Sequence, residues 1–234
     1  MKQTQKIYLP VDAIIFDMDG VITHTMPDHF RAWSQVLKNI GLSVSRHDIY
    51  KREGQRGITS IQELFRENGK TLSKQTAADL LRKKEVLFKK IVRRRFVPGS
   101  RLFIQALNRE RIRLGLVTGT SRDEMLRILP KNLRNCFDII VTGNDTVSGK
   151  PHPAPYRRVL KKLRIPPDQT VVIENAPLGI RSAKAAGCRC LALSTSLPKQ
   201  YLGEADHIFD SFQTLRRRIN FIPRECRPGK DGPR

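Results

Sequence analysis

The sequence of 234 residues contains few acidic residues, few aromatic residues and few cysteines. Its 22 aspartates and glutamates balance only half of its 44 lysines and arginines, which leaves a net charge of +22. No apolar run approaches the roughly 20 residues that cross a bilayer, and the polar start MKQTQKIYLP lacks the hydrophobic core of a secretory signal. We therefore expect a soluble cytoplasmic protein with no membrane partner, working as a monomer.

The cysteines and the basic charge each exclude one class of protein. Cys136, Cys188, Cys190 and Cys226 are too few and too irregularly placed for a disulfide framework, and no second ligand pair completes a zinc site. We interpret them as structural thiols. Aromatic residues make up only 6% and no nucleic-acid-binding signature accompanies the charge. The charge is therefore interpreted as a solvated surface that favours anionic substrates, with no specific nucleic-acid partner expected.

Short apolar runs that suit buried strands recur along the chain. Most are followed by a turn signal and then by a helical pattern, which favours parallel βαβ units. The sequence thus predicts an α/β fold with a Rossmann-like parallel sheet and helices on both faces. The runs are DAIIF (12–16), IRLGLV (112–117), FDIIV (137–141), TVVI (170–173) and CLAL (190–193).

The strand signal disappears between residues 26 and about 95, where helical periodicity replaces it. Phe30, Trp33 and Leu37 lie on one helical face, and Ser73 is suited to cap a long helix further on. We predict an inserted α-helical domain over residues 25–96. Residues 1–24 and 97–213 then form the core domain. Residues 214–234 form a basic tail, in which RPGKDGPR is expected to be poorly ordered.

Polar residues stand at four strand ends where a plain core would have apolar ones. They are Asp17 and Asp19, then Thr118-Gly119-Thr120, Lys150-Pro151 and Glu174-Asn175. In an open parallel sheet, ligands bind beyond the carboxyl ends of the strands. These segments are therefore predicted to converge on one crevice. Taken singly, each has a structural explanation: a turn, a surface lysine, or an acid at a helix N-terminus.

The residue types in this set suit phosphoryl transfer. Mg²⁺ prefers oxygen ligands, which Asp17, Glu174, Asn175 and the carbonyl of Asp19 would supply. A carboxylate can act as a nucleophile, and a neighbouring acid can exchange protons with the leaving group and with water. The Thr118 hydroxyl and the Lys150 ammonium would hold the phosphoryl oxygens.

The four motifs together resemble those of the haloacid dehalogenase superfamily of phosphotransferases. FDMDGVIT is similar to its first motif, VTGTS to its second, Lys150-Pro151 to its third, and VIENAPLGIRSAKAAG to its fourth; the resemblance runs from about residue 10 to 212. It implies that Asp17 is the nucleophile and Asp19 the general acid and base. It also implies that Thr118 and Lys150, with Gly119 and Thr120, bind the phosphate. The magnesium site would be formed by Asp17, Asp19, Glu174 and Asn175, and the helical insertion would be the family's cap.

Two positions depart from the family pattern. The residue after Glu174 is more often aspartate in this family, and Asn175 keeps an oxygen ligand while removing one negative charge. Metal affinity is therefore expected to be modestly lower. His24 occupies a place that Asp or Asn often holds, and either a contact with the phosphate or a plain turn position would fit it.

The run DGVITHTMPDHFRAW is similar to the β-phosphoglucomutase branch, which implies substrate roles for His29 and for Lys83 in the cap. The loop KREGQRG offers Arg52, Glu53 and Arg56 to the distal end of a substrate, although solvated turn charges fit equally well. Because phosphatases outnumber mutases in this superfamily, we expect a Mg²⁺-dependent phosphatase of a small phosphorylated metabolite, such as a sugar phosphate. A β-phosphoglucomutase is the first alternative, and a catalytically quiet, basic nucleic-acid-binding relative is the remote one.

Overall fold

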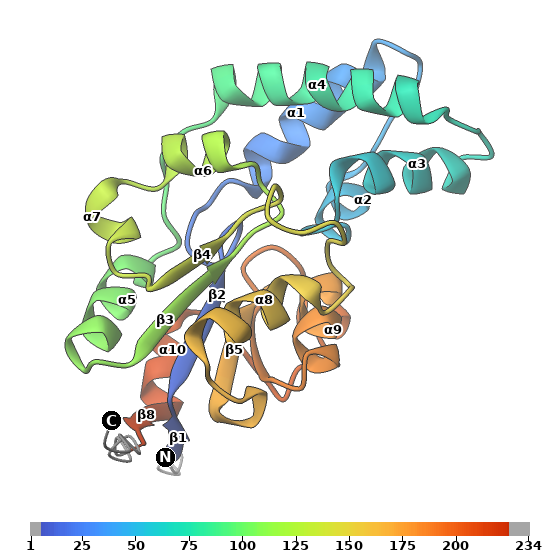
Figure 1. Ribbon diagram of the computed structural model, residues 1–234. Helices are drawn as coiled ribbons and strands as arrows, with labels where there is room; N and C mark the ends of the chain where they lie inside the picture. Colours follow the sequence, from blue (N-terminus) through green and yellow to red (C-terminus); the bar gives the residue numbers. More distant parts are fainter. Residues whose placement is uncertain (1–5, 225–234) are drawn as a thin grey trace, which may run out of the picture.

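The computed structural model describes residues 6–224, and its centre is a six-stranded parallel sheet (Figure 1). The strand order is β4-β3-β2-β5-β6-β7, so the chain builds outward from β2 first on one side and then on the other. The strands are β2 (Ala13–Asp17), β3 (Arg113–Val117), β4 (Ile139–Val141), β5 (Thr170–Glu174), β6 (Arg189–Leu193) and β7 (His207–Phe209). Because strand order reverses beside β2, a ligand crevice is expected at its carboxyl end.

Helices cover both faces of the sheet, and the alternation of side chains along β2 shows why. Ile14 and Phe16 pack into one hydrophobic cluster, whereas Ala13 and Ile15 pack into the other. The first cluster is covered by α5 (Ser100–Arg109), α6 (Arg122–Ile128), α7 (Lys131–Arg134) and α10 (Phe212–Arg218). The second is covered by α8 (Ala154–Leu163) and α9 (Pro177–Ala185). The predicted parallel sheet with helices on both faces is confirmed.

Four helices lie between β2 and α5 and form a separate block beyond one end of the sheet (Figure 1). They are α1 (Met26–Lys38), α2 (Arg46–Tyr50), α3 (Gly57–Glu67) and α4 (Lys74–Ile91). Trp33 and Leu37 of α1 pack with Ile61 of α3 and Leu80 of α4 in a third cluster. Ser73 is the N-cap residue of α4, as predicted, since its side chain accepts a hydrogen bond from the Thr76 N–H.

The segment expected to begin a basic tail is folded over its described part. Residues 214–218 belong to α10, and β8 (Ile219–Pro223) pairs in parallel with β1 (Ile7–Val11). Leu215, Ile219 and Phe221 are buried. Their burial keeps this segment folded although the residues around them are mostly basic. The stretch RPGKDGPR and Cys226 lie outside the described residues. The short 3-10 helices are Pro167–Gln169 and Lys199–Tyr201.

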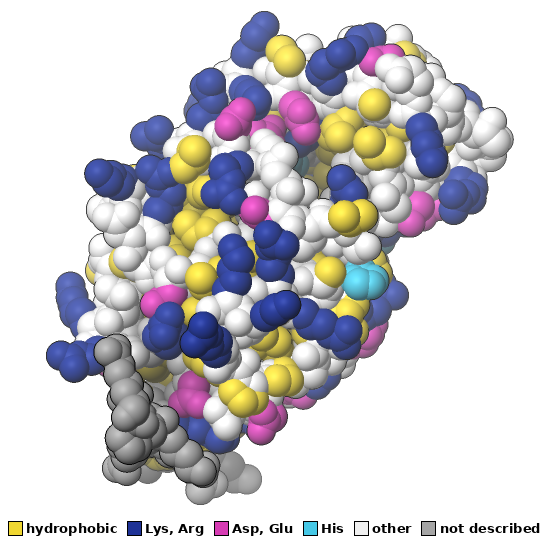
Figure 2. All heavy atoms as spheres, in the orientation of Figure 1, with side chains coloured by type: hydrophobic (Ala, Val, Ile, Leu, Met, Phe, Trp, Pro, Cys, Tyr) yellow, Lys and Arg dark blue, Asp and Glu magenta, His cyan; other side chains and the backbone are white. Residues whose placement is uncertain are grey.

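The charge and thiol expectations can be followed on the structure. Figure 2 shows Lys and Arg side chains scattered over the visible face of both the core and the helical block. Cys136, Cys188 and Cys190 are free and buried, and burial raises the pKa of Cys188 to about 12. Such a thiol stays protonated and unreactive at neutral pH. Among the helices of residues 6–224, none is long and apolar enough to cross a membrane.

Candidate active site

Three buried charged side chains meet at the carboxyl ends of β2 and β5. Asp17 is the last residue of β2 and Glu174 the last of β5, so the parallel register places them at the same edge. Lys150, from the loop before α8, reaches between them, with its Nζ 2.5 Å from Asp17 Oδ1 and 2.5 Å from Glu174 Oε1. Tyr156 of α8 donates its hydroxyl to Glu174 Oε1 at 2.6 Å. The sequence motifs gave no indication of Tyr156.

Negative charge at this edge exceeds what the single ammonium group balances. Burial raises the pKa of Asp17 to about 8; Lys150 opposes this rise, whereas the charges of Glu174 and Asp19 add to it. The pKa of Lys150 is in turn held above its ordinary value, because the two carboxylates outweigh the effect of its burial. This edge of the sheet therefore favours an additional cation.

Asp19 lies two residues beyond β2 and is held by hydroxyl groups from two parts of the chain. Its carboxylate accepts hydrogen bonds from Thr25 Oγ1 at 2.5 Å, Thr118 Oγ1 at 3.1 Å and Thr120 Oγ1 at 2.8 Å. His29 Nε2 of α1 lies 3.4 Å from Asp19 Oδ1. Burial alone would raise the pKa of Asp19, but the His29 and threonine contacts outweigh it and hold the pKa below the ordinary value. Asp19 is ionised at neutral pH in this arrangement.

Oxygen atoms suited to magnesium are present at the same edge. Asp17 Oδ2 and Asn175 Oδ1 are buried and have no hydrogen-bond partner among the described residues. Within residues 6–224, however, no three carboxylate, imidazole or thiol groups converge closely enough to hold a metal by themselves. Mg²⁺ commonly uses one or two carboxylates and completes its shell with water and substrate phosphate. The residues present fit such a partly hydrated ion.

The helical block closes one side of a cavity of about 250 Å³ above this edge. Asn175 Nδ2 donates to Glu53 Oε2 at 3.1 Å, which joins the core to the loop between α2 and α3. Gly54 of that loop approaches the core so closely that a Cβ there would lie 2.3 Å from Lys150 Cδ, and a Cβ on Gly119 would lie 3.1 Å from Gly54 Cα. The block is therefore seated against the core in this structure.

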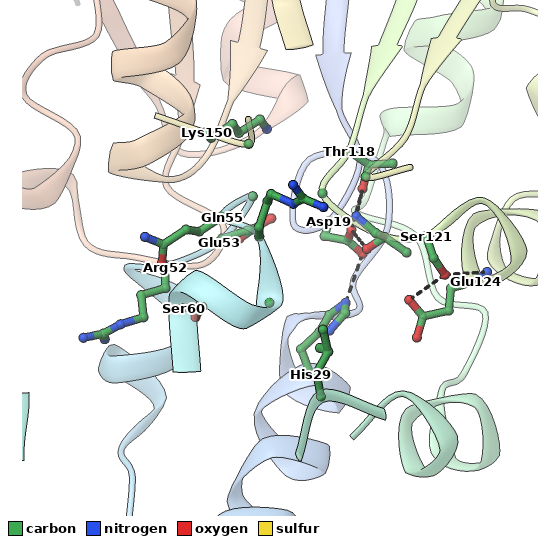
Figure 3. Close-up of a pocket in the computed structure, with 18 of the residues that line it drawn as sticks. Asp19, His29, Arg52, Glu53, Gln55, Ser60, Thr118, Ser121, Glu124 and Lys150 are labelled. Carbon is green, nitrogen blue, oxygen red and sulfur yellow. Dashed lines mark hydrogen bonds and ion pairs between the residues drawn. The ribbon is translucent and has the colours of Figure 1, made fainter. Parts of the chain in front are cut away.

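Figure 3 shows how the side chains expected to bind substrate lie around the cavity. His29 and Glu53 line it, His29 stacked on Phe88 with 4.0 Å between ring centroids. Arg52 also lines it, but its guanidinium donates to the Asp48 carbonyl and pairs with Glu67. Arg56 lines the cavity as well; it is exposed, and its guanidinium donates to the Val147 carbonyl.

The expected lysine of the cap is placed one residue away from the cavity. Lys83 is exposed on α4 and is not among the residues that line the cavity, whereas Lys84 is buried and lines it. Lys84 lies four residues from both Leu80 and Phe88, which are buried on the same helical face, and this spacing is the signal that identifies it. Burial lowers the pKa of Lys84, although Glu124, Glu85 and Asp19 partly oppose the shift.

His24 does not join the site. Its side chain is exposed and is absent from the residues that line the cavity. Its backbone N–H donates to the Arg95 carbonyl at 2.9 Å, where the two segments that connect the helical block to the core run side by side. The turn interpretation of this histidine fits its position.

Comparison with known proteins places this geometry in a family. The profile of the haloacid dehalogenase-like hydrolases matches residues 11–187. The chain is 30% identical to a phosphorylated carbohydrates phosphatase of Thermotoga maritima over 184 residues. The matched region covers 76% of this chain and 82% of that protein. It is 28% identical to a β-phosphoglucomutase of Bacillus subtilis over 80% of this chain and 84% of the relative. A solved structure of CbbY from Rhodobacter sphaeroides with phosphate superposes with a TM-score of 0.74 at 28% identity, covering 88% and 96% of the two chains.

Fold, site and family profile agree on the class of protein. The chain belongs to the haloacid dehalogenase-like hydrolases. It is a phosphohydrolase of the β-phosphoglucomutase-like group within them, as the resemblance in its motifs indicated.

Proposed function

We propose that this protein is a Mg²⁺-dependent phosphatase that hydrolyses a small sugar or polyol monophosphate through an aspartyl-phosphate intermediate. The observation that carries the proposal is the contact of Lys150 with both Asp17 and Glu174, directly beside Asp19. A relative named as a phosphatase of phosphorylated carbohydrates supports the substrate class. The cavity of about 250 Å³ suits a small metabolite.

In the first step, a carboxylate oxygen of Asp17 attacks the phosphorus and the ester P–O bond breaks. The leaving alkoxide takes a proton from Asp19, which leaves the alcohol product and an acyl phosphate on Asp17. In the second step, Asp19 removes a proton from water as the water oxygen attacks the phosphorus. The P–O bond to Asp17 then breaks, inorganic phosphate leaves, and both carboxyl groups return to their starting states.

Asp19 must carry a proton for the first step, although its pKa is low in this structure. Two of the hydroxyls that keep it ionised, those of Thr118 and Thr120, are also the groups proposed to bind the phosphoryl oxygens. A phosphate ester that recruits these hydroxyls removes hydrogen bonds from the carboxylate. The pKa of Asp19 then rises, because hydrogen bonds that favour the carboxylate are lost while burial still favours the protonated form. Substrate binding thereby prepares the general acid.

The magnesium ion is proposed to be held by Asp17, Asn175 and the backbone carbonyl of Asp19. Glu174 lies next to these groups and adds negative charge to the site. When bound, Mg²⁺ supplies positive charge that screens the carboxylate nucleophile from the phosphoryl oxygens. Lys150 then contributes its ammonium to the same oxygens, as well as orienting Asp17.

The helical block of residues 25–96 is proposed to act as a cap that excludes water while the ester is cleaved. The Asn175–Glu53 hydrogen bond and the close approach of Gly54 to Lys150 support a closed form in which loop 51–57 covers the reacting groups. We further propose that the enzyme works as a monomer in the cytoplasm.

A phosphomutase is the second candidate, supported by the β-phosphoglucomutase relative. A mutase intermediate carries two phosphates, and arginine is the residue best suited to a second one. Arg52 is instead paired with Glu67, whereas Arg56 lines the cavity and donates to the Val147 carbonyl. The pairing of Arg52 favours the phosphatase.

The deciding experiment measures phosphate release from a panel of sugar and polyol phosphates with Mg²⁺. Asp17→Asn is expected to abolish release, whereas the control Asp12→Asn, at the opposite end of β2, keeps it. β-Glucose 1-phosphate is assayed in parallel for glucose 6-phosphate with a trace of the bisphosphate. Isomerisation with little free phosphate would replace the phosphatase by the mutase. Salt-sensitive binding of RNA with no turnover would replace both by the nucleic-acid-binding alternative.

A further inference from the structure

One wall of the cavity contains a carboxylate that the proposed reaction does not use. Glu124 of α6 is 3% exposed, and its Oε2 accepts a hydrogen bond from Ser121 Oγ at 3.1 Å. Its Oε1 is buried and has no partner among the described residues, although Glu124 lines the cavity. Figure 3 shows Glu124 on the α6 side of the cavity, with Asp19 and His29 between it and the loop that carries Gln55.

Gln55, in the loop on the other side of Asp19, carries another unpartnered acceptor, but Figure 3 shows its amide turned away from Glu124. Gln55 donates its Nε2 to Glu63 Oε2 at 2.8 Å, which assigns the other amide atom as oxygen. That oxygen is also buried and unpartnered within residues 6–224. A buried acceptor without a donor costs free energy. The unpartnered Glu124 oxygen therefore indicates a ligand that brings a hydrogen-bond donor, as a hydroxyl group does.

Lys84 is the cation that interacts with Glu124, as the effect of Glu124 on the pKa of Lys84 shows. Arg52 pairs with Glu67, and Arg56, which also lines the cavity, donates to the Val147 carbonyl. Glu85 and Glu124 both line the cavity with Lys84. A second phosphate or a carboxylate on the substrate would have no proton to donate and would add negative charge beside Glu124. A hydroxyl can donate to Glu124 and accept from Lys84 at the same time.

We propose that Glu124 determines specificity by accepting a hydrogen bond from a hydroxyl group in the unphosphorylated part of the substrate. It selects neutral, polyhydroxylated monophosphates and rejects bisphosphates and phosphorylated acids. The inference rests on the proposed function, because the phosphate must sit at Asp17 and Asp19 for the rest of the substrate to reach Glu124.

The test measures ligand dissociation constants by calorimetry in full-length protein carrying Asp17→Asn, which binds esters without cleaving them. The probes are fructose 6-phosphate, fructose 1,6-bisphosphate and phenyl phosphate, all with Mg²⁺. The dissociation constant of fructose 6-phosphate is expected to be at least about tenfold lower than that of either other probe. A hydrogen bond to a charged group changes a dissociation constant by about that factor. Adding Glu124→Gln is expected to bring both ratios close to one.

Asp123→Asn is the matched control, because it removes the same charge from the adjacent, exposed position of α6. It should leave both ratios as they are. The inference would be overturned if the ratios of dissociation constants were the same with and without Glu124→Gln. It would also be overturned if the protein carrying only Asp17→Asn bound fructose 1,6-bisphosphate more tightly than fructose 6-phosphate. If Glu124→Gln does not fold, the comparison of the three probes in Asp17→Asn still decides between acceptance and rejection of a second phosphate. Failure of the phosphatase proposal is seen separately, as a native chain that binds fructose 6-phosphate in this pattern and releases no phosphate.

Discussion

Lys150→Met is the substitution that tests most directly how the charges of the site are balanced. Methionine keeps the length and the apolar stem of lysine but removes the ammonium that lies 2.5 Å from both Asp17 Oδ1 and Glu174 Oε1. All three side chains are almost completely buried. Removing one partner of a buried ion pair costs about 3–5 kcal/mol, because the remaining charge is left uncompensated. We expect a loss of stability of that size at neutral pH.

The size of this loss should depend on pH, and the sign follows from Asp17. Its pKa is raised to about 8 by burial and by Glu174 and Asp19 even with Lys150 present, so the folded chain holds a proton that the unfolded chain releases near pH 4. The contribution of Asp17 to the free energy of unfolding is complete below about pH 4. It is lost progressively as the pH rises to about 8, the pKa in the folded state. Without Lys150 the folded-state pKa is higher still, which extends the decline to higher pH. The deficit of the variant therefore grows above about pH 8, by up to about 1.4 kcal/mol per pH unit for one proton.

The measurement is urea unfolding followed by circular dichroism at pH 7 and pH 9.5, on either side of the pKa of Asp17 in the native chain, without Mg²⁺. Lys161→Met is the control, because Lys161 is exposed on α8 and has no part in the site. It should change stability by less than about 0.5 kcal/mol at both pH values. A Lys150→Met deficit that is below about 1 kcal/mol, or that is equal at the two pH values, would refute the charge balance described here.

Three further substitutions probe the groups around this pair. Asn175→Asp replaces the donor to Glu53 by a carboxylate, so the loss of about 1 kcal/mol or more should open the loop and speed trypsin cleavage within residues 51–57 at least fivefold. Gly179→Ala should reduce phosphate release more than tenfold while the circular dichroism spectrum is preserved, since its Cβ would lie 1.9 Å from Glu174 Oε1. Tyr156→Phe removes the hydroxyl bonded to Glu174 and should lower the free energy of unfolding by about 1–3 kcal/mol; no change in urea unfolding would argue against that bond.

The parts of the structure that sequence alone could predict are those set by local pattern. Five strands were expected from apolar runs, and each has a counterpart in the sheet within two residues at either end. The strand ends also placed Asp17, Thr118, Lys150 and Glu174 in one crevice, because parallel strands share an edge. The short strands β1, β7 and β8 were missed, since three to five residues of mixed polarity give no clear periodicity.

Side-chain direction in the helical block could not be predicted in the same way. Lys83 and Lys84 are identical in sequence terms, but neighbouring helix positions point about 100° apart, and only Lys84 lines the cavity. Arg52 lies in the expected loop, yet its guanidinium binds Asp48 and Glu67. Which partner a long side chain chooses depends on tertiary contacts that no local pattern records.

The position of β2 in the sheet has a consequence for how the chain acquires its structure during synthesis. β2 is made before both of its partners, and all five of its residues are buried. Its two partners are β3, which begins at Arg113, and β5, which begins at Thr170. The nascent AIIFD segment therefore has both edges unpaired until β3 is made and one edge unpaired until β5 is made, and unpaired apolar edges are sites of aggregation. The intervening helices rely on local contacts and can form meanwhile, so a chaperone that holds residues 13–17 should raise the yield of folded enzyme.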